Sequence, residues 1–555
     1  MEFLRLTSLV VFCVALFMLG EKWFAEYGPK SNPVSVETKG AERPAVGDIP
    51  SPTTSQSPVT VKESQIVPAS TPAPVAGETI TLRNDVLELE ISTIGGDIRR
   101  AVLLKHGDTL DPRKPFVLLE TGGNHTYLAQ SGLTAKGLPN HKTVFTASSK
   151  DTRLAEGQNE VSVDLTASGA DGVSIVTKRY SLKRGEYLLS LSQRVVGLPE
   201  ESPSPTAYFQ LVRDEKPPVG GSRWVPTYNG VALYTEKDKY QKVSFEDIAK
   251  GKASHTSDGN DGWIGMVQHY FVSAWLPEKG SRRDFFTRNL DQGLYAAGVM
   301  VPMAKAADGN WQVTVPLYVG PQEQEKLKTL ADGLQLTVDY GWLTVIATPL
   351  FWLLSAIHKW VSQNWGVTII LLTLLIKLAF FPLSAASYKS MAKMRVMGPK
   401  LQKLKEIHGD DRQKLHQAMM ELYKTEKINP LGGCLPVVIQ IPVFISLYWV
   451  LLGSVEMRQA PFALWITDLS SPDPIYILPV LMGISMIIQS RLNPEPPDPI
   501  QAKVMKIMPV AFSVFFFFFP AGLVLYWLVN NILSIGQQWY ITRQLETAGL
   551  GVAKR

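Results

Sequence analysis

The stretch WGVTIILLTLLIKLAFFPL, residues 365–383, decides the class of this protein. It is almost continuously apolar, and Lys377 is its only charged residue. A helix needs about 20 consecutive, mostly apolar residues to cross the hydrocarbon core of a bilayer. The stretch therefore predicts a membrane-spanning helix that carries one cation inside the hydrocarbon.

Four further apolar runs follow along the chain and predict a helical membrane domain over residues 364–540. The predicted spans are residues 364–383, 429–452, 475–490, 507–519 and 521–538, the last two joined as a tight hairpin by Pro520. Some of these runs are short for a span, which predicts a locally thinned bilayer. Residues 341–362 are rich in Trp and contain Pro349, so we predict an amphipathic helix on the outer membrane surface, with a true span as the alternative.

The beginning of the chain predicts one more span. Residues 1–24 are largely apolar and are followed by bulky and charged residues instead of a cleavage site, so we predict an uncleaved anchor. Residues 25–77 are rich in Pro, Ser and Thr and predict a flexible linker. Six spans place both termini in the cytoplasm, including a short tail at residues 541–555. The two cysteines, Cys13 and Cys434, lie in apolar segments, so no disulfide is expected to support the fold.

Between linker and membrane domain the sequence pattern becomes that of strands. Residues 79–91, TITLRNDVLELEI, alternate apolar and polar side chains around a turn and predict a strand–turn–strand unit. The same alternation returns in residues 161–165, 173–182, 187–195 and 311–319. We therefore predict a large antiparallel β-sandwich over residues 78–333, on the extracytoplasmic side. Residues 322–332 predict a short helix that Gly333 ends.

A basic segment lies between the second and third predicted spans. Residues 389–428 contain ten Lys and Arg against five Asp and Glu, a surplus equal to the +5 of the whole chain. Nucleic-acid binding would also suit a basic chain, but a surplus between two apolar runs indicates a cytoplasmic loop. Apolar residues at helical spacing predict a helical hairpin over residues 388–428. Its candidate docking residues for cytoplasmic partners are Lys393, Met394, Arg395, Met397, Lys400, Lys403 and Lys405; the alternative is a hairpin that packs on itself.

Lys377 is the residue that most needs a functional explanation. A Lys at the centre of a membrane helix costs about 2.5–3.5 kcal/mol, and the later predicted spans contain no Asp or Glu to pair with it. Thr373 precedes it by one turn on the same face, and Gln440, Asn530 and Ser534 add polar groups from other spans. We predict a hydrated, positively charged groove that attracts acidic segments of passing chains. The alternative is that the ammonium snorkels to the membrane surface.

Two other function classes remain in competition. A small-solute transporter would explain a polar helical bundle, but the sequence has no internal repeat and no paired broken helices. An extracytoplasmic enzyme would need clustered chemistry, whereas the histidines of the β region have no metal or catalytic spacing; they are His106, His125, His141, His255 and His269. With no phosphate loop either, we expect no enzyme activity, cofactor, metal or small-molecule substrate.

Several motifs resemble the YidC/Oxa/Alb family of membrane protein insertases. The most specific are INPLGGCLP at residues 428–436, QIPVF at 440–444 and GSVEMRQAPFALWI at 453–466. SMAKMR at residues 390–395 and FPAGLVLYW at 519–527 also match. The resemblance covers essentially the whole chain, and the large first extracytoplasmic domain is similar to that of Gram-negative bacterial members.

The resemblance implies a polytopic inner-membrane protein with six spans, five of which form a grooved core, and a periplasmic all-β supersandwich. It implies insertion of nascent membrane proteins into the bilayer, alone or with SecYEG and SecDF, and the ribosome and the signal recognition particle receptor as further partners. The family's groove charge falls on Lys377, where well-studied members carry Arg; Lys keeps the charge without the bidentate fork. Tyr526 and Trp527 are expected to line the groove, Trp527 at the position of a substrate-contacting Tyr.

Overall fold

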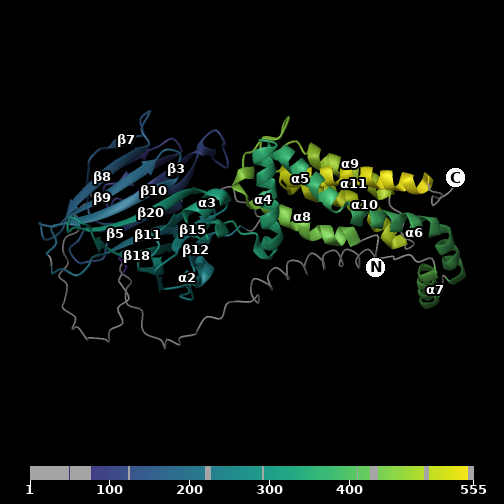
Figure 1. Cartoon of the computed structure of the whole chain (residues 1–555), viewed down its shortest axis with the longest axis horizontal. Coiled ribbons are helices and arrows are strands. Elements are labelled where there is room, and N and C mark those ends of the chain that lie inside the picture. Colours follow the sequence, from purple (N-terminus) through teal and green to yellow (C-terminus); the bar gives the residue numbers. More distant parts are fainter. Residues whose placement is uncertain are drawn as a thin grey trace. The chain divides into compact units, whose positions relative to one another are not determined.

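The computed structural model describes residues 49–50, 77–122, 125–199, 201–218, 227–290, 293–408, 411–425, 435–492 and 499–547. The predicted anchor, nearly all of the predicted linker and the end of the predicted tail lie outside these residues. The described chain consists of an all-β domain followed by a helical region (Figure 1).

The β domain is built from two sheets, in which the pairings of the described strands are antiparallel except that of β1 with the edge strand β7. The first sheet runs in the order β14 (Asp258–Gly259), β17 (Arg283–Leu290), β18 (Leu294–Pro302), β11 (Thr206–Asp214), β5 (His125–Leu133), β4 (Pro115–Gly122), β3 (Ile98–Gly107), β2 (Leu87–Ser92), β1 (Thr79–Arg83) and β7 (Asp151–Arg153). The second runs in the order β13 (Lys239–Val243), β12 (Gly230–Thr235), β15 (Trp263–Gln268), β16 (Phe271–Trp275), β20 (Trp311–Pro321), β10 (Leu188–Val196), β9 (Ile175–Lys183), β8 (Glu160–Ser168) and β6 (Thr146–Ala147), with β19 (Ala304–Lys305) beside β20.

The first predicted turn also connects the two sheets. The side-chain oxygen of Asn84 accepts hydrogen bonds from the backbone N–H groups of Val86 and Leu87, at 2.9 and 2.6 Å, and so shapes the turn between β1 and β2. The amide nitrogen of Asn84 donates to the carbonyl oxygens of Lys183 and Glu186, which lie at the β9–β10 turn of the second sheet. One buried amide therefore satisfies backbone groups of both sheets.

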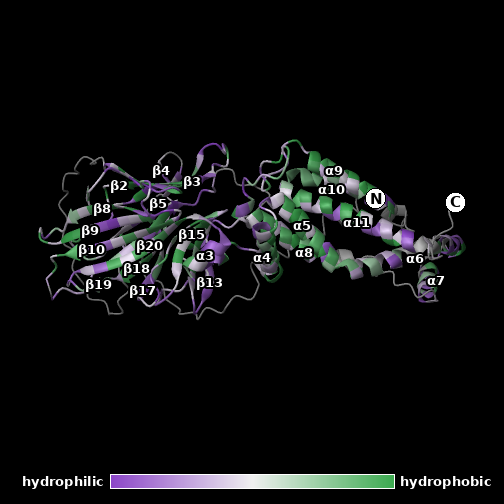
Figure 2. Cartoon of the chain, turned by 45° about the horizontal axis from the view of Figure 1, so that its top comes forward, coloured by the Kyte–Doolittle hydropathy of each residue, from purple (hydrophilic) through white to green (hydrophobic). Residues whose placement is uncertain are grey.

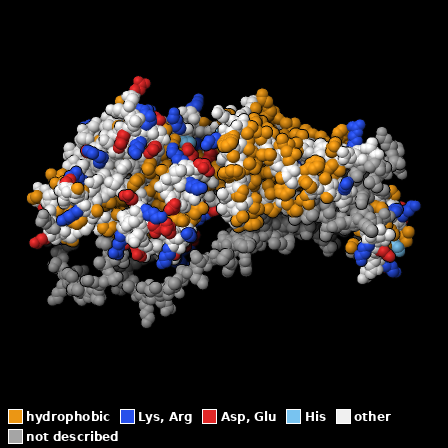
Figure 3. Space-filling view, viewed as in Figure 1, with side chains coloured by type: hydrophobic (Ala, Val, Ile, Leu, Met, Phe, Trp, Pro, Cys, Tyr) orange, Lys and Arg blue, Asp and Glu red, His pale blue; other side chains and the backbone are white. Residues whose placement is uncertain are grey.

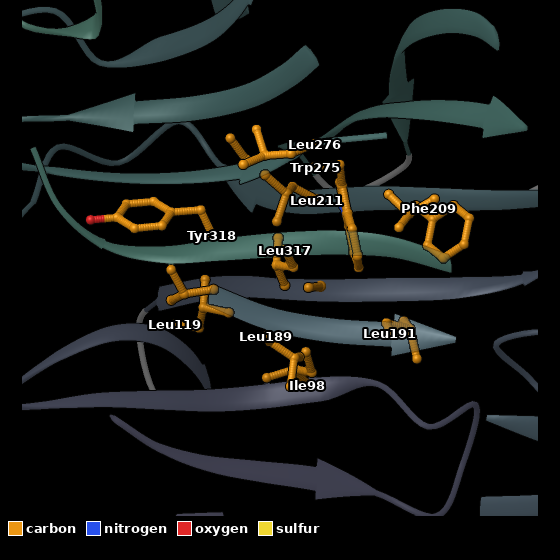
Figure 4. Packing of buried hydrophobic residues seen from close by; sticks show 14 of the residues in the cluster. Ile98, Leu119, Leu189, Leu191, Phe209, Leu211, Trp275, Leu276, Leu317 and Tyr318 are labelled. Atoms are coloured by element: carbon orange, nitrogen blue, oxygen red, sulfur yellow. The ribbon is translucent and has the colours of Figure 1, made fainter. Parts of the chain in front are cut away.

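The core of the β domain lies between the sheets. Side chains alternate between the two faces of a strand, so β11 sends Phe209 and Leu211 into the interior, where Trp275 of β16 meets them (Figure 4). The ring centroids of Phe209 and Trp275 lie 5.1 Å apart. Both rings are almost fully buried, and burial on this scale supplies most of the stabilisation of such a sandwich.

Short helices accompany the sheets, and longer ones form the second region. The former are α2 (Phe245–Ala249), α3 (Gln324–Leu330) and the 3₁₀ helix η2 (Leu334–Thr337). The latter are η3 (Gly341–Leu343), α4 (Thr344–Trp360), α5 (Trp365–Ala379), α6 (Phe381–His408), α7 (Arg412–Thr425), α8 (Leu435–Gly453), η5 (Val455–Met457), α9 (Ile477–Leu492), α10 (Pro499–Phe515), η6 (Phe516–Phe518) and α11 (Ala521–Thr547). Helix α3 ends at Leu330 with Ala331 as its C-cap, so the prediction that Gly333 ends this helix was wrong; Gly333 has a left-handed φ of +75° and is the N-cap of η2.

The surface of the helical region is predominantly apolar. Figure 3 shows a nearly continuous hydrophobic surface over the helices, whereas charged side chains are spread over the β domain. Helices α5, α8 and α9 are also mostly hydrophobic along their length (Figure 2). An exposed apolar area of this extent is unusual in soluble proteins and indicates a lipid environment.

The predicted span at residues 364–383 is broken in the structure. Helix α5 ends at Ala379, and the segment Phe381–Met391 of α6 continues at an angle of 65° to it. Pro382 explains the break, because proline has no N–H to continue the helix and disfavours helical geometry at the residue before it. Lys377 consequently lies in the last turn of α5 and not at the centre of a long helix.

The described helices do not establish six spans. One helical segment, Gly341–Trp360, is long and apolar enough to cross a membrane, and the bent pair of α5 and the start of α6 adds a second if it forms one span. The apolar helices Ile439–Gly453 and Ile477–Leu492 are shorter than a full span. The segment Gly341–Trp360, predicted to lie on the membrane surface, thus has the length of a span, while Trp342 and Trp360 at its two ends remain highly exposed.

Candidate functional site

Helix α11 organises the polar part of the helical region. It contacts α5, α6, α8 and α9, and one of its faces carries Asn530, Ser534 and Gln537 at one-turn spacing. The sequence following Pro520 is otherwise strongly apolar for two turns. Ser534 is buried and Asn530 and Gln537 are half-buried, so this polar face is directed toward the neighbouring helices.

Lys377 reaches this face of α11. Its Nζ donates a hydrogen bond to Oγ of Ser534 at 2.7 Å, and the Ser534 hydroxyl donates in turn to the carbonyl oxygen of Asn530 at 2.7 Å. Lys377 is half-buried and Ser534 is buried. Within the described ranges, no carboxylate forms an ion pair with Lys377. The cation is thus held by a neutral hydroxyl.

A third helix completes this arrangement. The side-chain amide of Gln440, on α8, donates to the side-chain oxygen of Asn530. Lys377, Gln440, Asn530 and Ser534, hereafter the polar cluster, therefore combine side chains of α5, α8 and α11. All four residues were predicted as site residues, and the structure brings them together across three helices.

Thr373 was predicted beside them but is not part of the polar cluster. Its hydroxyl donates to the carbonyl oxygen of Ile369 in its own helix at 2.7 Å, and its side chain is 1% exposed. A Thr within a helix can satisfy its hydroxyl in this way. Sharing a helix face with Lys377 was therefore insufficient to place it in the same network.

Two aromatic residues lie one turn before Asn530 on α11. Trp527 packs edge-on against Phe444 at 4.5 Å and beside Phe516 at 5.5 Å, between ring centroids. Tyr526 is 2% exposed and lies 6.2 Å from Phe444. Both predicted residues thus contribute to an aromatic layer next to the polar cluster, and Tyr526 is deeply buried within it.

Other polar residues of these helices connect α11 to its neighbours. The amide of Asn531 donates to Oγ of Ser485 on α9 at 3.1 Å, and the amide of Gln538 donates to the carbonyl oxygen of Leu492 at 3.2 Å. Ser384 and Ser387 of α6 are also buried, and the predicted site did not include them. Their spacing of three residues on the helix that contacts α11 was the available sequence indication.

The predicted cytoplasmic hairpin corresponds to α6 and α7. Asp411 accepts hydrogen bonds from the backbone N–H groups of Gln413 and Lys414, both at 3.1 Å, and so caps α7 as expected for an Asp at a helix start. Met397, predicted as an exposed docking residue, is only 4% exposed and packs inside the structure. Lys400 and Lys403 are exposed, while the side chains of Lys393, Met394, Arg395 and Lys405 lie outside the described atoms.

The polar cluster offers binding chemistry and no obvious catalytic arrangement. It contains one ammonium group, one hydroxyl and two neutral amides, so it can attract an anion and form hydrogen bonds with a polar backbone. Among the residues that the structure describes, no group of three or more His, Cys, Asp or Glu is placed to hold a metal ion.

The chain thus combines an all-β domain with a region of apolar helices, and a polar cluster lies among those helices. This combination defines a membrane protein with a polar site in its helical part. Residues 79–353 match the family model of the YidC periplasmic domain, and residues 356–548 match that of the 60Kd inner membrane protein. The chain belongs to the YidC family, and its β domain is the periplasmic domain of that family.

Curated relatives support this assignment over the full length. The membrane protein insertase YidC of Nitrosospira multiformis is 52% identical over 100% of this chain and 99% of the relative. That of Methylobacillus flagellatus is 53% identical, with 99% and 98% covered. A crystal structure of an active YidC insertase with its first transmembrane domain resolved aligns with a TM-score of 0.41 at 18% identity, over 84% of this chain and 93% of that one.

Proposed function

We propose that this chain is a membrane protein insertase of the bacterial inner membrane, which inserts nascent membrane proteins and assists their folding. Full-length relatives at about half identity carry that name. The observation that carries the mechanism is the hydrogen bond between Lys377 and Ser534, in which a cation among apolar helices is held by a neutral group. Such a cation keeps its charge available for an incoming acidic segment.

The first step in this mechanism is attraction. A carboxylate about 4 Å from the Lys377 ammonium gains roughly 4 kcal/mol at an effective dielectric constant near 20, before desolvation is counted. The carboxylate must displace the Ser534 hydroxyl, which forms a charge-assisted hydrogen bond worth about 1.5–3 kcal/mol. The net preference is thus about 1–2.5 kcal/mol by difference, which is strong enough to select acidic segments and weak enough to release them.

The second step is passage through a shortened hydrocarbon layer. Helix α5 has 15 residues and α9 has 16, which at 1.5 Å per residue span about 22–24 Å, less than the roughly 30 Å hydrocarbon core. Short helices favour local thinning of the bilayer. We infer a hydrated groove lined by the polar cluster, with Thr373 at its back and Tyr526 and Trp527 at its aromatic end. The substrate's apolar helix then moves sideways into lipid, driven by its own transfer free energy.

The proposed topology places six spans in the membrane, with both termini in the cytoplasm and the β domain in the periplasm. It keeps the boundaries predicted from the sequence: an anchor at residues 1–24, an interfacial helix at 341–362 and five core spans within 364–540. The basic hairpin of α6 and α7 would then face the cytoplasm, in agreement with its charge. There it would dock nascent chains or the ribosome, while SecYEG and SecDF would be partners within the membrane.

Depletion of the protein in cells tests the proposed function. We expect a short single-span protein with an acidic periplasmic tail to lose membrane insertion, measured by protease accessibility of that tail, and to regain it on re-expression of the chain. A secreted protein without a membrane span serves as the control for general export. If insertion continues at the normal rate after depletion, or if vesicles with the purified chain show Lys377-dependent uptake of a small solute, the insertase function is contradicted.

A further inference from the structure

Among the described residues of the β domain, three cationic side chains are completely buried, and one of them differs from the other two. Lys178 donates to the backbone oxygens of Gly95 and Ser131 and to Oγ of Ser131, at 2.6–2.9 Å. Arg283 donates to several carbonyl oxygens, including that of Gly262 at 2.7 Å. Arg213 is equally buried, at 0% exposure, but none of its three guanidinium nitrogens has a hydrogen-bond acceptor among the described residues.

The strand geometry shows where Arg213 points. On β11 the interior row is formed by Ala207, Phe209 and Leu211, and Arg213 is the next member of that row. Figure 4 shows Phe209 and Leu211 directed into the core beside Trp275. The arginine therefore extends an apolar row into the space between the two sheets.

Within the described part of the chain, the guanidinium contacts an aromatic ring. Arg213 pairs in register with Tyr127 of β5, and the guanidinium carbon lies 4.8 Å from the centroid of the Tyr127 ring. A cation–π contact supplies about 0.5–2 kcal/mol, but it satisfies none of the N–H donors. An unsatisfied buried donor costs about 1–3 kcal/mol, and an arginine cannot avoid that cost by losing its proton.

Among the described residues, no carboxylate forms a hydrogen bond with Arg213, and the charge of Asp214 acts on the guanidinium without contacting it. The adjacent Asp214 lies on the other face of the strand, where its carboxylate accepts from the His125 ring and the backbone N–H of Thr126. Burial raises the pKa of the Tyr127 hydroxyl, so it remains a neutral phenol and is not a counter-ion.

The second sheet provides a further donor opposite Arg213. Ser273 of β16 is 0% exposed, and its hydroxyl makes no hydrogen bond of normal geometry with any described residue. It lies close enough to the Tyr127 hydroxyl to influence the pKa of that group. Tyr127 thus lies beside both the buried guanidinium and a hydroxyl of the second sheet, and its own hydroxyl is 3.5 Å from the carbonyl oxygen of Met266.

We propose that Arg213, Tyr127 and Ser273 form a buried site for a small monovalent anion of the halide class, with chloride as the natural occupant. The anion neutralises the guanidinium and accepts hydrogen bonds from both sheets. A water molecule would accept the same hydrogen bonds but would leave the positive charge uncompensated. Because the three side chains are 0–3% exposed, the occupant must be small and must shed its hydration shell. The site would bind the two sheets together independently of insertion activity.

Crystals of the full-length protein grown with bromide in place of chloride test the site directly. We expect an anomalous bromide peak within hydrogen-bond distance of the Arg213 guanidinium. If no bromide peak is found there and a water molecule refines in that position, the proposal is overturned. This experiment uses the wild-type protein and so does not depend on the folding of a variant.

Thermal unfolding of the purified full chain gives the matched solution test. Chloride is varied while gluconate keeps the ionic strength constant. The melting temperature of the β domain should rise with chloride concentration, because an anion that binds only the folded state stabilises that state. Arg213→Met should abolish this dependence and Ser273→Ala should weaken it. Arg194→Met, which removes an exposed strand arginine paired with Asp308, should retain it. Equal chloride dependence in the Arg213→Met and wild-type proteins contradicts an anion at this site.

Discussion

Replacing Lys377 by methionine tests whether its charge selects substrates. Methionine has nearly the same length and removes only the ammonium group, so the hydrogen bond to Ser534 disappears while the apolar contacts of the side chain persist. Because a half-buried cation among apolar helices is costly to hold, Lys377→Met should not lower the stability of the helical region. Loss of insertion would then reflect the missing charge and not an unfolded protein.

The expected size of the effect follows from the two competing interactions of the ammonium. Exchange of the Ser534 hydroxyl for a substrate carboxylate gains about 1–2.5 kcal/mol, the difference between roughly 4 kcal/mol of attraction at 4 Å and about 1.5–3 kcal/mol for the hydrogen bond. A translocated segment with one carboxylate should therefore be inserted about 5–70 times faster by the wild-type protein than by Lys377→Met. Lys377→Arg keeps the charge and should stay close to wild type.

The assay is insertion of a purified single-span substrate into proteoliposomes. Two substrates are compared, one with an acidic translocated tail and one in which Asn and Gln replace every Asp and Glu of that tail. The effect of Lys377→Met should be confined to the acidic substrate. Lys359→Met removes an exposed Lys in the last turn of α4 and is the matched control, since it lies outside the polar cluster. Unchanged insertion of the acidic substrate by Lys377→Met would refute the electrostatic argument.

Three further predictions concern packing and pH. Trp275→Ala should destabilise the β domain by about 3–5 kcal/mol, seen as a lower denaturation midpoint, because the ring is buried against Phe209; an unchanged midpoint would contradict the core assignment. Gly366→Ala should destabilise the helical region, because the new methyl group would clash with the Phe462 ring, and Phe462→Ala should rescue it; a fully stable single variant would disprove this contact. Burial lowers the pKa of His255 below its usual 6.5, so its contribution to stability is present above pH 6.5 and is lost as the pH falls below that value. His255→Gln should make the melting temperature less sensitive to acid, and equal sensitivity would contradict a buried neutral imidazole.

Strand periodicity was sufficient to predict the β domain but not its topology. Alternation within residues 79–91 predicted β1, β2 and their turn, since that pairing is local. The sequence contained no comparable information on β11, which lies between β18 and β5 and joins distant segments. Asn84 illustrates the difference: its position in a turn was predictable, whereas its hydrogen bond to Lys183, 99 residues away, was not.

The helical site shows the same division between local and distant information. Apolar runs indicated the helices, and the lack of an acidic partner singled out Lys377. Its actual partner, Ser534, is 157 residues away, so only the packing of α5 against α11 reveals it. Local competition also misled the prediction, because the Thr373 hydroxyl bonds to its own helix. The break after Ala379 could have been inferred from Pro382, which lies in the stretch that predicted the span.

The choice of a hydroxyl as the partner of Lys377 has a consequence for release. A carboxylate on a neighbouring helix would hold the ammonium in a buried ion pair, and removing one member of such a pair costs about 3–5 kcal/mol, so a substrate could not compete for it. With no partner at all, the ammonium would bear its full desolvation cost and the helices would favour a drier arrangement. A serine lies between these limits, because it stabilises the cation enough to keep it between the helices and yields to any incoming carboxylate. Substituting Ser534 by Asp should therefore abolish the preference for acidic substrates while leaving the charge of Lys377 in place, and an Asp variant that still selects acidic tails would show that the neutral partner is irrelevant.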